Sequence, residues 1–91
     1  MPTIAIPSAL TKFTDGKSSA KVDGATVRAA LGALDQRHPG IGGKLLAGDG
    51  VKPFIRIYVG AEDISALSGL DTPVGADDEI SIIPAIAGGI A

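Results

Sequence analysis

The sequence predicts an α+β fold, a roll in which a mixed sheet of four or five strands packs on one main helix. Three observations carry this prediction. Apolar side chains alternate in two separate segments, residues 3–6 and 54–59, as they do in half-buried strands. Between these segments, apolar residues recur at the spacing of a single helical stripe. Further strand signals follow in the C-terminal half, so the helix is expected to cover one face of a common sheet.

The N-terminal part of the chain predicts a hairpin. A strand over residues 3–6 ends at Pro7, because proline cannot continue a sheet ladder except at an edge. Asp15-Gly16 is a turn signal, and a short polar strand over residues 18–22 then returns.

The main helix is predicted to begin after Thr26, a residue type that caps helix N-termini. Proline disfavours helical geometry at the residue before it, so Pro39 places the end of the helix near Arg37 or His38. The apolar stripe of this helix follows the spacing i, i+3, i+4, i+7 and consists of Val27, Ala30, Leu31 and Leu34. A further apolar turn is expected at residues 41–46.

The C-terminal half predicts two strands separated by a long connection. In the strand over residues 54–59, alternate side chains point to opposite faces, with Ile55, Ile57 and Val59 on one face and Phe54, Arg56 and Tyr58 on the other. Residues 47–52 are predicted to form a loop, and a stretch of irregular coil with a little packing is expected after residue 62. The last strand covers residues 80–85, with Ile80 and Ile82 facing inward.

The composition of the chain excludes several classes of site. The sequence contains no cysteine, and its single histidine has no partners for a catalytic triad or a metal cluster. The net charge of −2 argues against nucleic acid as a partner. No apolar run approaches the ~20 residues needed to cross a bilayer, and residues 1–10 lack the features of a signal peptide. We therefore expect a cytoplasmic protein without a bound metal or cofactor.

The C-terminal end of the chain has no polar side chain over residues 85–91. Such a stretch offers too little surface to offset its ordering entropy, so we expect a domain over residues 1–85 and a flexible tail over residues 86–91. Within this tail, Gly88-Gly89 lacks Cβ atoms and can thread a narrow channel in which any side chain would clash. The alternative interpretation is a frayed end without a function.

These features resemble the ThiS/MoaD family of ubiquitin-like sulfur carriers. The resemblance is carried by residues 54–59, by residues 62–64 and by residues 78–89, in which a hydrophobic strand, Pro84 and small or aliphatic residues precede the diglycine. It covers essentially the whole chain, and the nearest branch is the CysO branch of actinobacterial cysteine biosynthesis. The resemblance implies a β-grasp fold.

The resemblance also implies that the chain is handled by enzymes and is not itself an enzyme. An adenylyltransferase/sulfurtransferase of the MoeB or ThiF type would use ATP to activate the carboxylate of Gly89 as an acyl-adenylate. Sulfur would then displace AMP and leave a thiocarboxylate on Gly89. Gly88, which has no side chain, would keep the segment next to the thiocarboxylate narrow. A sulfur-acceptor synthase would take the sulfur toward cysteine or a specialised metabolite, while thiamin thiazole and molybdopterin are other destinations of such carriers.

Two residues beyond the diglycine depart from the family pattern. Adenylation needs a free carboxylate on Gly89, and here Ile90 and Ala91 follow it. The β-branched Ile90 also fits poorly in a channel shaped for glycine. We therefore expect proteolytic removal of this extension, and similar carriers with extensions imply a metallopeptidase of the JAMM type.

The sheet face turned away from the helix is predicted to bind the partners. Large apolar residues exposed on a one-layer sheet are either covered by another part of the protein or used to bind a partner. In the family, this face leads to the tail. The predicted contact residues are Phe54, Arg56, Tyr58, Ile83, Pro84 and Ile86. Arg56 is the expected polar anchor. The alternative is that these are ordinary half-exposed strand residues.

Three other functions remain open at this point. The chain could be the small subunit of a molybdopterin-synthase-like complex, a ubiquitin-like modifier joined to lysines, or a binding module whose glycines only form a flexible end.

Overall fold

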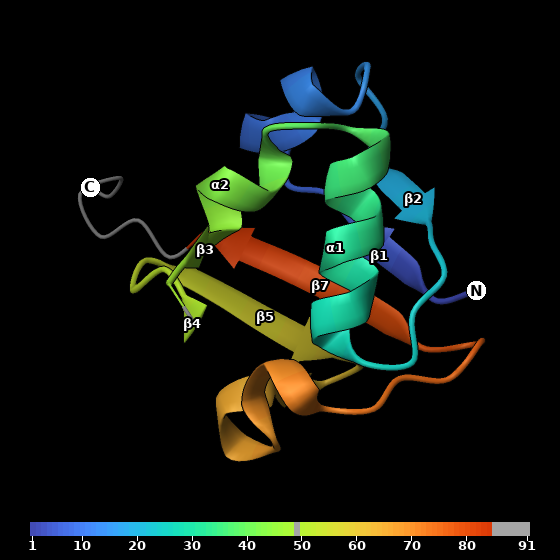
Figure 1. Cartoon of the computed structure of the whole chain (residues 1–91), viewed down its shortest axis with the longest axis vertical. Helices are drawn as coiled ribbons and strands as arrows, with labels where there is room; N and C mark the ends of the chain where they lie inside the picture. The colour runs from blue at the N-terminus through green and yellow to red at the C-terminus, as the bar shows by residue number, and fades with distance from the viewer. Residues whose placement is uncertain (49, 85–91) are drawn as a thin grey trace.

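The computed structural model describes residues 1–48 and 50–84, and within them a mixed sheet packs one face against helix α1 (Val27–Arg37) (Figure 1). The strand order is β2-β1-β7-β5-β6. The bounds are Thr3–Ala5 for β1, Ser19–Lys21 for β2, Ile55–Val59 for β5, Glu62–Asp63 for β6 and Glu79–Pro84 for β7. Strands β1 and β7 are parallel, and the other pairs are antiparallel. The predicted mixed sheet of four or five strands on one main helix is thus confirmed, and it has five strands.

Helix α1 begins and ends where the sequence predicts. The Thr26 side-chain oxygen accepts a hydrogen bond from the Ala29 amide at 3.1 Å, which satisfies one of the free donors of the first turn. At the other end, His38 is the C-cap residue, and its amide donates to the Leu34 carbonyl at 2.8 Å.

The core is aliphatic and lies between α1 and the sheet. All four residues of the predicted helical stripe are at most 1% exposed. They meet the inward residues of the strands, which are Ile4, Ile55, Ile57, Ile80 and Ile82. Full burial of each Val, Leu or Ile side chain contributes roughly 1.5–3 kcal/mol, so this shared layer holds helix and sheet together.

A 3₁₀ helix, η1 (Ser8–Phe13), occupies the connection between β1 and β2 and was not predicted. Its partly buried Leu10 and Phe13 pack against the core. Thr14, which is fully buried, donates its hydroxyl to the Lys17 carbonyl at 2.7 Å and so satisfies a polar group under the turn.

The predicted loop over residues 47–52 is wrong in part. Helix α2 (Ile41–Leu45) provides the expected apolar turn, and it is followed by two paired strands, β3 (Leu46–Ala47) and β4 (Gly50–Val51). Both helices lie on the same side of the sheet (Figure 1). The strands are two residues long, which is too short for any periodic pattern to indicate them.

The predicted coil after residue 62 contains two short 3₁₀ helices, η2 (Ile64–Ala66) and η3 (Gly69–Asp71). Leu70 and the following Val74 are buried, and together they close the end of the core beside α1. This segment thus packs more closely than an irregular connection would.

Gly24 provides a test of the packing between α1 and the segment before it. A Cβ atom at this position would lie 2.5 Å from the Ala30 nitrogen, which is a backbone atom that cannot rotate away. We expect Gly24→Ala to lower the free energy of unfolding by about 1–3 kcal/mol, as overpacking does. Gly32→Ala is the matched control, since Gly32 is exposed within α1 and no atom outside the helix approaches it.

We expect Gly32→Ala to raise the free energy of unfolding by roughly 0.5–1 kcal/mol, because alanine is the better helix former. Urea denaturation of both variants measures the difference. Equal effects of the two substitutions would contradict the packing described here.

Candidate functional site

The end of strand β7 is the part of the candidate site that the structure describes. The predicted sulfur-bearing residues Gly88 and Gly89, the extension Ile90-Ala91 and the predicted contact Ile86 lie outside the described residues. The predicted domain boundary at residue 85 does so as well. The described site is therefore the surface from which the chain continues after Pro84.

Strand β7 is held on both sides by neighbours far away in the sequence. It pairs with β1 over Glu79 to Ser81 and with β5 over Ile80 to Pro84, so that Pro84 lies opposite Ile55. Beyond Ser81 its only described neighbour is β5, and a proline is tolerated where a strand has a neighbour on one side. The sheet therefore fixes the position and direction of the chain at Pro84.

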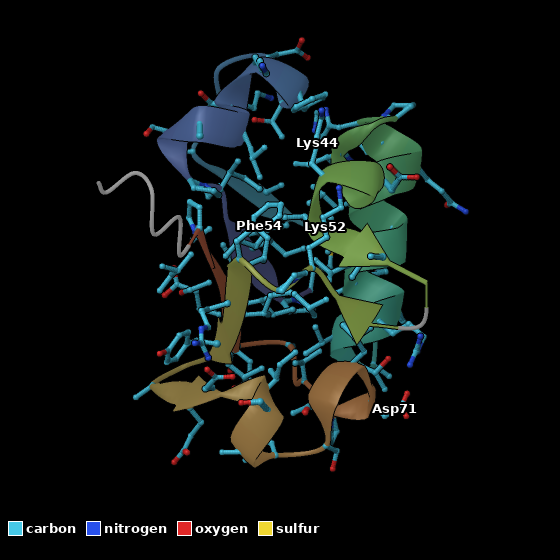
Figure 2. The ribbon with its side chains drawn as sticks, turned by 90° about the vertical axis from the view of Figure 1, so that its left-hand side faces the viewer. Lys44, Lys52, Phe54 and Asp71 are labelled. Carbon is cyan, nitrogen blue, oxygen red and sulfur yellow. The ribbon has the colours of Figure 1, made fainter. Side chains whose placement is uncertain are left out.

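The residues predicted to bind partners gather around this end of β7. The register places Arg56 opposite Ile83 and Tyr58 opposite Ser81, and all four side chains belong to the face turned away from α1. Phe54 directly precedes β5 and is seen on the side of the molecule toward which β7 points (Figure 2). We call the described members of the predicted set, Phe54, Arg56, Tyr58, Ile83 and Pro84, the docking face.

The docking face combines large apolar side chains with one cation. Phe54 is 47% exposed and Ile83 is 45% exposed, while Tyr58 and Pro84 are half-buried. The Arg56 side chain is 57% exposed. Exposed apolar side chains beside a long basic one have the composition of a protein-binding surface.

Sequence reasoning missed the role of Asp63, which orients Arg56. Arg56 Nη1 lies 3.7 Å from Asp63 Oδ2, and Asp63 Oδ1 accepts a hydrogen bond from the Ser65 amide at 2.9 Å. The Asp-x-Ser pattern ahead of η2 was the available signal, since an aspartate side chain often caps the amide two residues on. The carboxylate thus ties the guanidinium to the end of β6.

The environment of Asp63 holds its pKa below the ordinary value of 3.8. The largest cause is the hydrogen bond from the Ser65 amide, followed by the Ser65 side chain, and the Arg56 charge acts in the same direction. Partial burial raises the pKa and offsets part of this effect. Asp63 is therefore ionised, and able to hold Arg56, throughout the neutral range.

Two further observations concern the described residues as a whole. Over residues 1–48 and 50–84, no group of three or more His, Asp or Glu side chains lies together in a way that could hold a metal ion. In the same ranges, no helix is both long enough and apolar enough to cross a membrane.

The strand order, the single long helix on one face and the central C-terminal strand define a ubiquitin-like β-grasp protein. The model of the ThiS family matches residues 6–89, and the chain belongs to this family. The resemblance to the ThiS/MoaD family seen in the sequence is thus confirmed.

The chain is similar over nearly its whole length to carriers called CysO. It is 35% identical over 92 residues to the sulfur carrier protein CysO of Mycobacterium tuberculosis, covering 96% of this chain and 97% of the relative. The crystal structure of that species' CysO superimposes with a TM-score of 0.89 at 30% identity, over 94% of this chain and 100% of the other. The CysO-like character expected from the sequence is therefore confirmed.

A solved complex provides a second structural neighbour. The BexX/CysO complex of Amycolatopsis orientalis contains a chain with a TM-score of 0.93 and 36% identity, covering 98% of this chain and 100% of that one. A CysO-like protein is thus known in association with another protein.

The Asp63 carboxylate generates a prediction about acid stability. Because its folded-state pKa is lowered, its contribution to stability is complete above the unfolded-state pKa and is lost as the pH falls through the folded-state value. We expect the wild type to lose stability relative to Asp63→Asn as the pH falls below about 4. The control is Asp71→Asn, which removes the exposed carboxylate of η3 that pairs with Arg28 at 3.3 Å.

Denaturation midpoints at closely spaced pH values measure this difference. If the difference in denaturation midpoint between wild type and Asp63→Asn stayed constant down to about pH 2, the carboxylate would not be held in the way described.

Proposed function

We propose that this chain is a sulfur carrier that delivers sulfur as a thiocarboxylate on Gly89. The observation that supports this most strongly is the position of β7. The central strand is fixed up to Pro84, and the sequence from there to the diglycine contains only Ala85, Ile86 and Ala87. A short, slender segment that starts from a rigid platform suits insertion into the active site of another protein.

The first step of the proposed cycle is maturation. A metallopeptidase of the JAMM type adds water across the peptide bond between Gly89 and Ile90 and releases the dipeptide Ile90-Ala91. The free carboxylate of Gly89 is the product. Without this cleavage the Gly89 carbonyl stays in a peptide bond and has no carboxylate oxygen to react with ATP.

Activation and sulfur loading follow on a MoeB/ThiF-like adenylyltransferase/sulfurtransferase. A Gly89 carboxylate oxygen attacks the α-phosphorus of ATP, and pyrophosphate leaves. Hydrosulfide then attacks the acyl carbon, so that a C–S bond forms as the bond from carbon to the AMP oxygen breaks. All the catalytic groups belong to the partner, and this chain contributes the reacting carboxyl group and the docking face.

The acceptor is a biosynthetic synthase of cysteine or of a specialised sulfur metabolite. The similarity to CysO over the whole chain supports this assignment. The Amycolatopsis orientalis complex supports a stable encounter with another protein. In our proposal, Phe54, Ile83 and Pro84 bury their apolar surface against the synthase, while Arg56, held by Asp63, provides the polar contact.

A second candidate function, protein modification, also has an observation in its favour. The chain is 31% identical over 67 residues to the small archaeal modifier protein 3 of Haloferax volcanii, covering 74% of this chain and 73% of the relative. The activation chemistry is the same, and the acceptor would be a lysine amine instead of a sulfur-accepting enzyme. Higher-mass conjugates in blots of a tagged chain would favour this alternative.

Mass spectrometry of the chain from its native host tests the proposed function. We expect a species that ends at Gly89, and a second species whose mass shows one oxygen replaced by sulfur. The second species should disappear on treatment with an alkylating reagent, because the thiocarboxylate is a good nucleophile at neutral pH.

A matched pair of purified chains gives the control for this experiment. A chain that ends at Gly89 should form the acyl-adenylate with ATP and the activating enzyme, and the chain that ends at Ala91 should not. If the native host contained only the chain ending at Ala91, the maturation step would be wrong.

The docking face generates a separate prediction. Ile83→Asp places a negative charge among the apolar side chains of the docking face, and we expect it to weaken binding to the activating enzyme or the acceptor synthase by at least about tenfold. Leu67→Asp is the matched control, because Leu67 is also 45% exposed but lies in the connection after η2. It should leave binding within about twofold.

Isothermal titration calorimetry with either partner measures both affinities. Equal losses from Ile83→Asp and Leu67→Asp would place the contact elsewhere on the molecule.

A further inference from the structure

The charges of this chain are divided unevenly along its sequence. Residues 1–56 contain eight lysine and arginine residues and four aspartates, whereas residues 57–91 contain six acidic residues and neither lysine nor arginine. The two parts therefore carry formal charges of +4 and −6, which together give the −2 of the whole chain. An asymmetry of this kind indicates that the surface differs in charge from one end to the other.

The sheet places the acidic residues beside the start of β7. Glu79 is the first residue of this strand, and Asp77 and Asp78 precede it directly. Strand β6, which contains Glu62, pairs with the end of β5, and the antiparallel register sets that end beside the start of β7. All four side chains are exposed. We call Glu62, Asp77, Asp78 and Glu79 the acidic end.

Two exposed lysines lie beyond the opposite end of β7. Because β1 is parallel to β7, the segment that follows β1, η1 with Lys12, lies at the end toward which β7 points. The ammonium groups of Lys12 and Lys44 approach the same ring, that of Phe13, at 5.6 and 5.9 Å from its centre. Helix α2 therefore places Lys44 at this end as well.

A third lysine connects this group to the docking face. The Lys52 amide donates to the Leu45 carbonyl at 2.9 Å, which places Lys52 beside the last residue of α2. Phe54 of the docking face follows two residues later, and Figure 2 shows Lys44, Lys52 and Phe54 in one region of the surface. We call Lys12, Lys44 and Lys52 the basic end.

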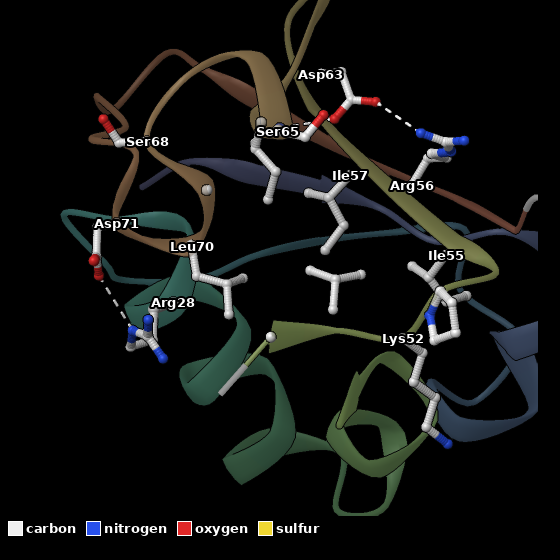
Figure 3. A pocket seen from close by; sticks show the side chains of 15 residues that line it. Arg28, Lys52, Ile55, Arg56, Ile57, Asp63, Ser65, Ser68, Leu70 and Asp71 are labelled. Carbon is white, nitrogen blue, oxygen red and sulfur yellow. Dashed lines mark hydrogen bonds and ion pairs between the residues drawn. The ribbon is translucent and has the colours of Figure 1, made fainter. Parts of the chain in front are cut away.

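The lysines of the basic end have no salt bridges within the described residues. Arg28 and Arg56 are each paired with an aspartate, at 3.3 and 3.7 Å, whereas none of the three lysines is paired in this way among residues 1–48 and 50–84. Lys52 lies apart from both pairs (Figure 3). The charge of the basic end is therefore available to a partner.

The acids near this end do not cancel its charge. The Asp35 carboxylate accepts hydrogen bonds from the Gly40 and Gly42 amides at 3.2 and 2.9 Å, so it is directed toward α2. Asp15, in the turn after η1, is followed by Lys17. Between residues 38 and 56, three bases stand against one aspartate.

The two ends are far enough apart to act separately. The strand from Glu79 to Pro84 spans about 16 Å, at roughly 3.3 Å per residue. The Debye length is about 8 Å at physiological ionic strength, so a surface that approaches one end is largely screened from the charges of the other. The basic end therefore attracts an acidic surface although the net charge of the chain is −2.

We propose that the basic end binds an acidic rim around the active site of the activating enzyme and orients the carrier during their encounter. The inference rests on the proposed function, in which the segment that carries Gly89 enters that active site. Every carrier must reach the activating enzyme, whichever acceptor follows. The basic end turns the end of β7 toward this enzyme before contact, the acidic end is repelled, and the docking face then supplies the short-range contacts.

Stopped-flow association with the activating enzyme tests this inference, with the chain that ends at Gly89, which retains every described residue. We expect the association rate constant of the wild type to fall at least about tenfold between about 20 and 500 mM salt, because salt screens the attraction. Lys44→Glu should lower the rate constant about fivefold at the low salt concentration and less than about twofold at the high one. The dissociation rate constant should change by less than about twofold.

Lys21→Glu is the matched control for net charge. Lys21 is an exposed lysine of β2, and the register sets both it and Glu79 opposite Thr3, so it lies level with the acidic end. Its reversal should leave the association rate constant within about twofold of the wild type. Lys12→Glu changes another element of the basic end and should reproduce the effect of Lys44→Glu, which excludes a local disturbance of α2 as the cause.

An NMR titration of the full-length chain tests the same surface without an enzyme. The probe is acetylated and amidated hexaglutamate at about 5 mM and about 20 mM salt. We expect amide shifts at Lys12, Lys44 and Lys52 and none over residues 62–79. Formation of the acyl-adenylate at saturating enzyme belongs to the proposed function alone, and Lys44→Glu should leave its extent unchanged.

Four results would overturn the inference. Equal losses from Lys21→Glu and Lys44→Glu would show that only net charge matters. A wild-type association rate constant that stays constant or rises with salt would mean that the receiving surface is not acidic. Hexaglutamate shifts that are absent or lie outside the basic end would do the same for the carrier. Self-association at low salt that Lys44→Glu abolishes would assign the basic end to the acidic end of a second copy. In each case, acyl-adenylate formation by the wild type would leave the proposed function standing.

Discussion

The pairing of β7 with both β1 and β5 is the constraint on which the rest of the structure depends. It joins the first strand of the chain to the last described one, across more than seventy residues of sequence. Without β7, the hairpin of β1 and β2 and the hairpin of β5 and β6 would be two separate pieces, and a two-stranded hairpin alone is marginally stable in water. The same pairing places Ile83 beside Arg56 and fixes the chain at Pro84.

The single helical layer explains why one face of the sheet is available. Helices α1 and α2 lie on the same side, so the core forms there and the other face carries half-exposed side chains (Figure 1). The two edges of the sheet differ as well. At the β2 edge, Arg37 Nη1 donates to the Lys21 carbonyl at 2.9 Å and covers it, whereas the other edge is formed by the two-residue strand β6.

The main elements could be predicted because their signals are local. The stripe on α1 and the alternation in β5 reflect burial on one face, and Thr26 and Pro39 mark the helix ends through their own backbone and side-chain chemistry. The elements that sequence reasoning missed, η1 and the β3–β4 pair, are short segments without a period. They form because the core beneath them, not their own pattern, stabilises them.

The candidate site, too, could be predicted from the sequence only in part. Alternation along β5 already placed Arg56 and Tyr58 on one face, but the partner of Arg56 could not be known. The Asp63 carboxylate reaches Arg56 only because a two-residue turn folds β6 back beside β5. Asp63 also ends β6 and caps η2 through the Ser65 amide, a double role that becomes visible only once the strand pairing is known.

The sequence by itself determined the fold class, the aliphatic core and the presence of a diglycine end without polar side chains, because composition and periodicity are properties of the chain alone. Only the tertiary structure decided which strand lies beside which, and how Ile83 comes to lie beside Arg56 in the docking face. The physical reason is that a period of two assigns a side chain to a face, while register and neighbours arise from packing between residues far apart in the chain.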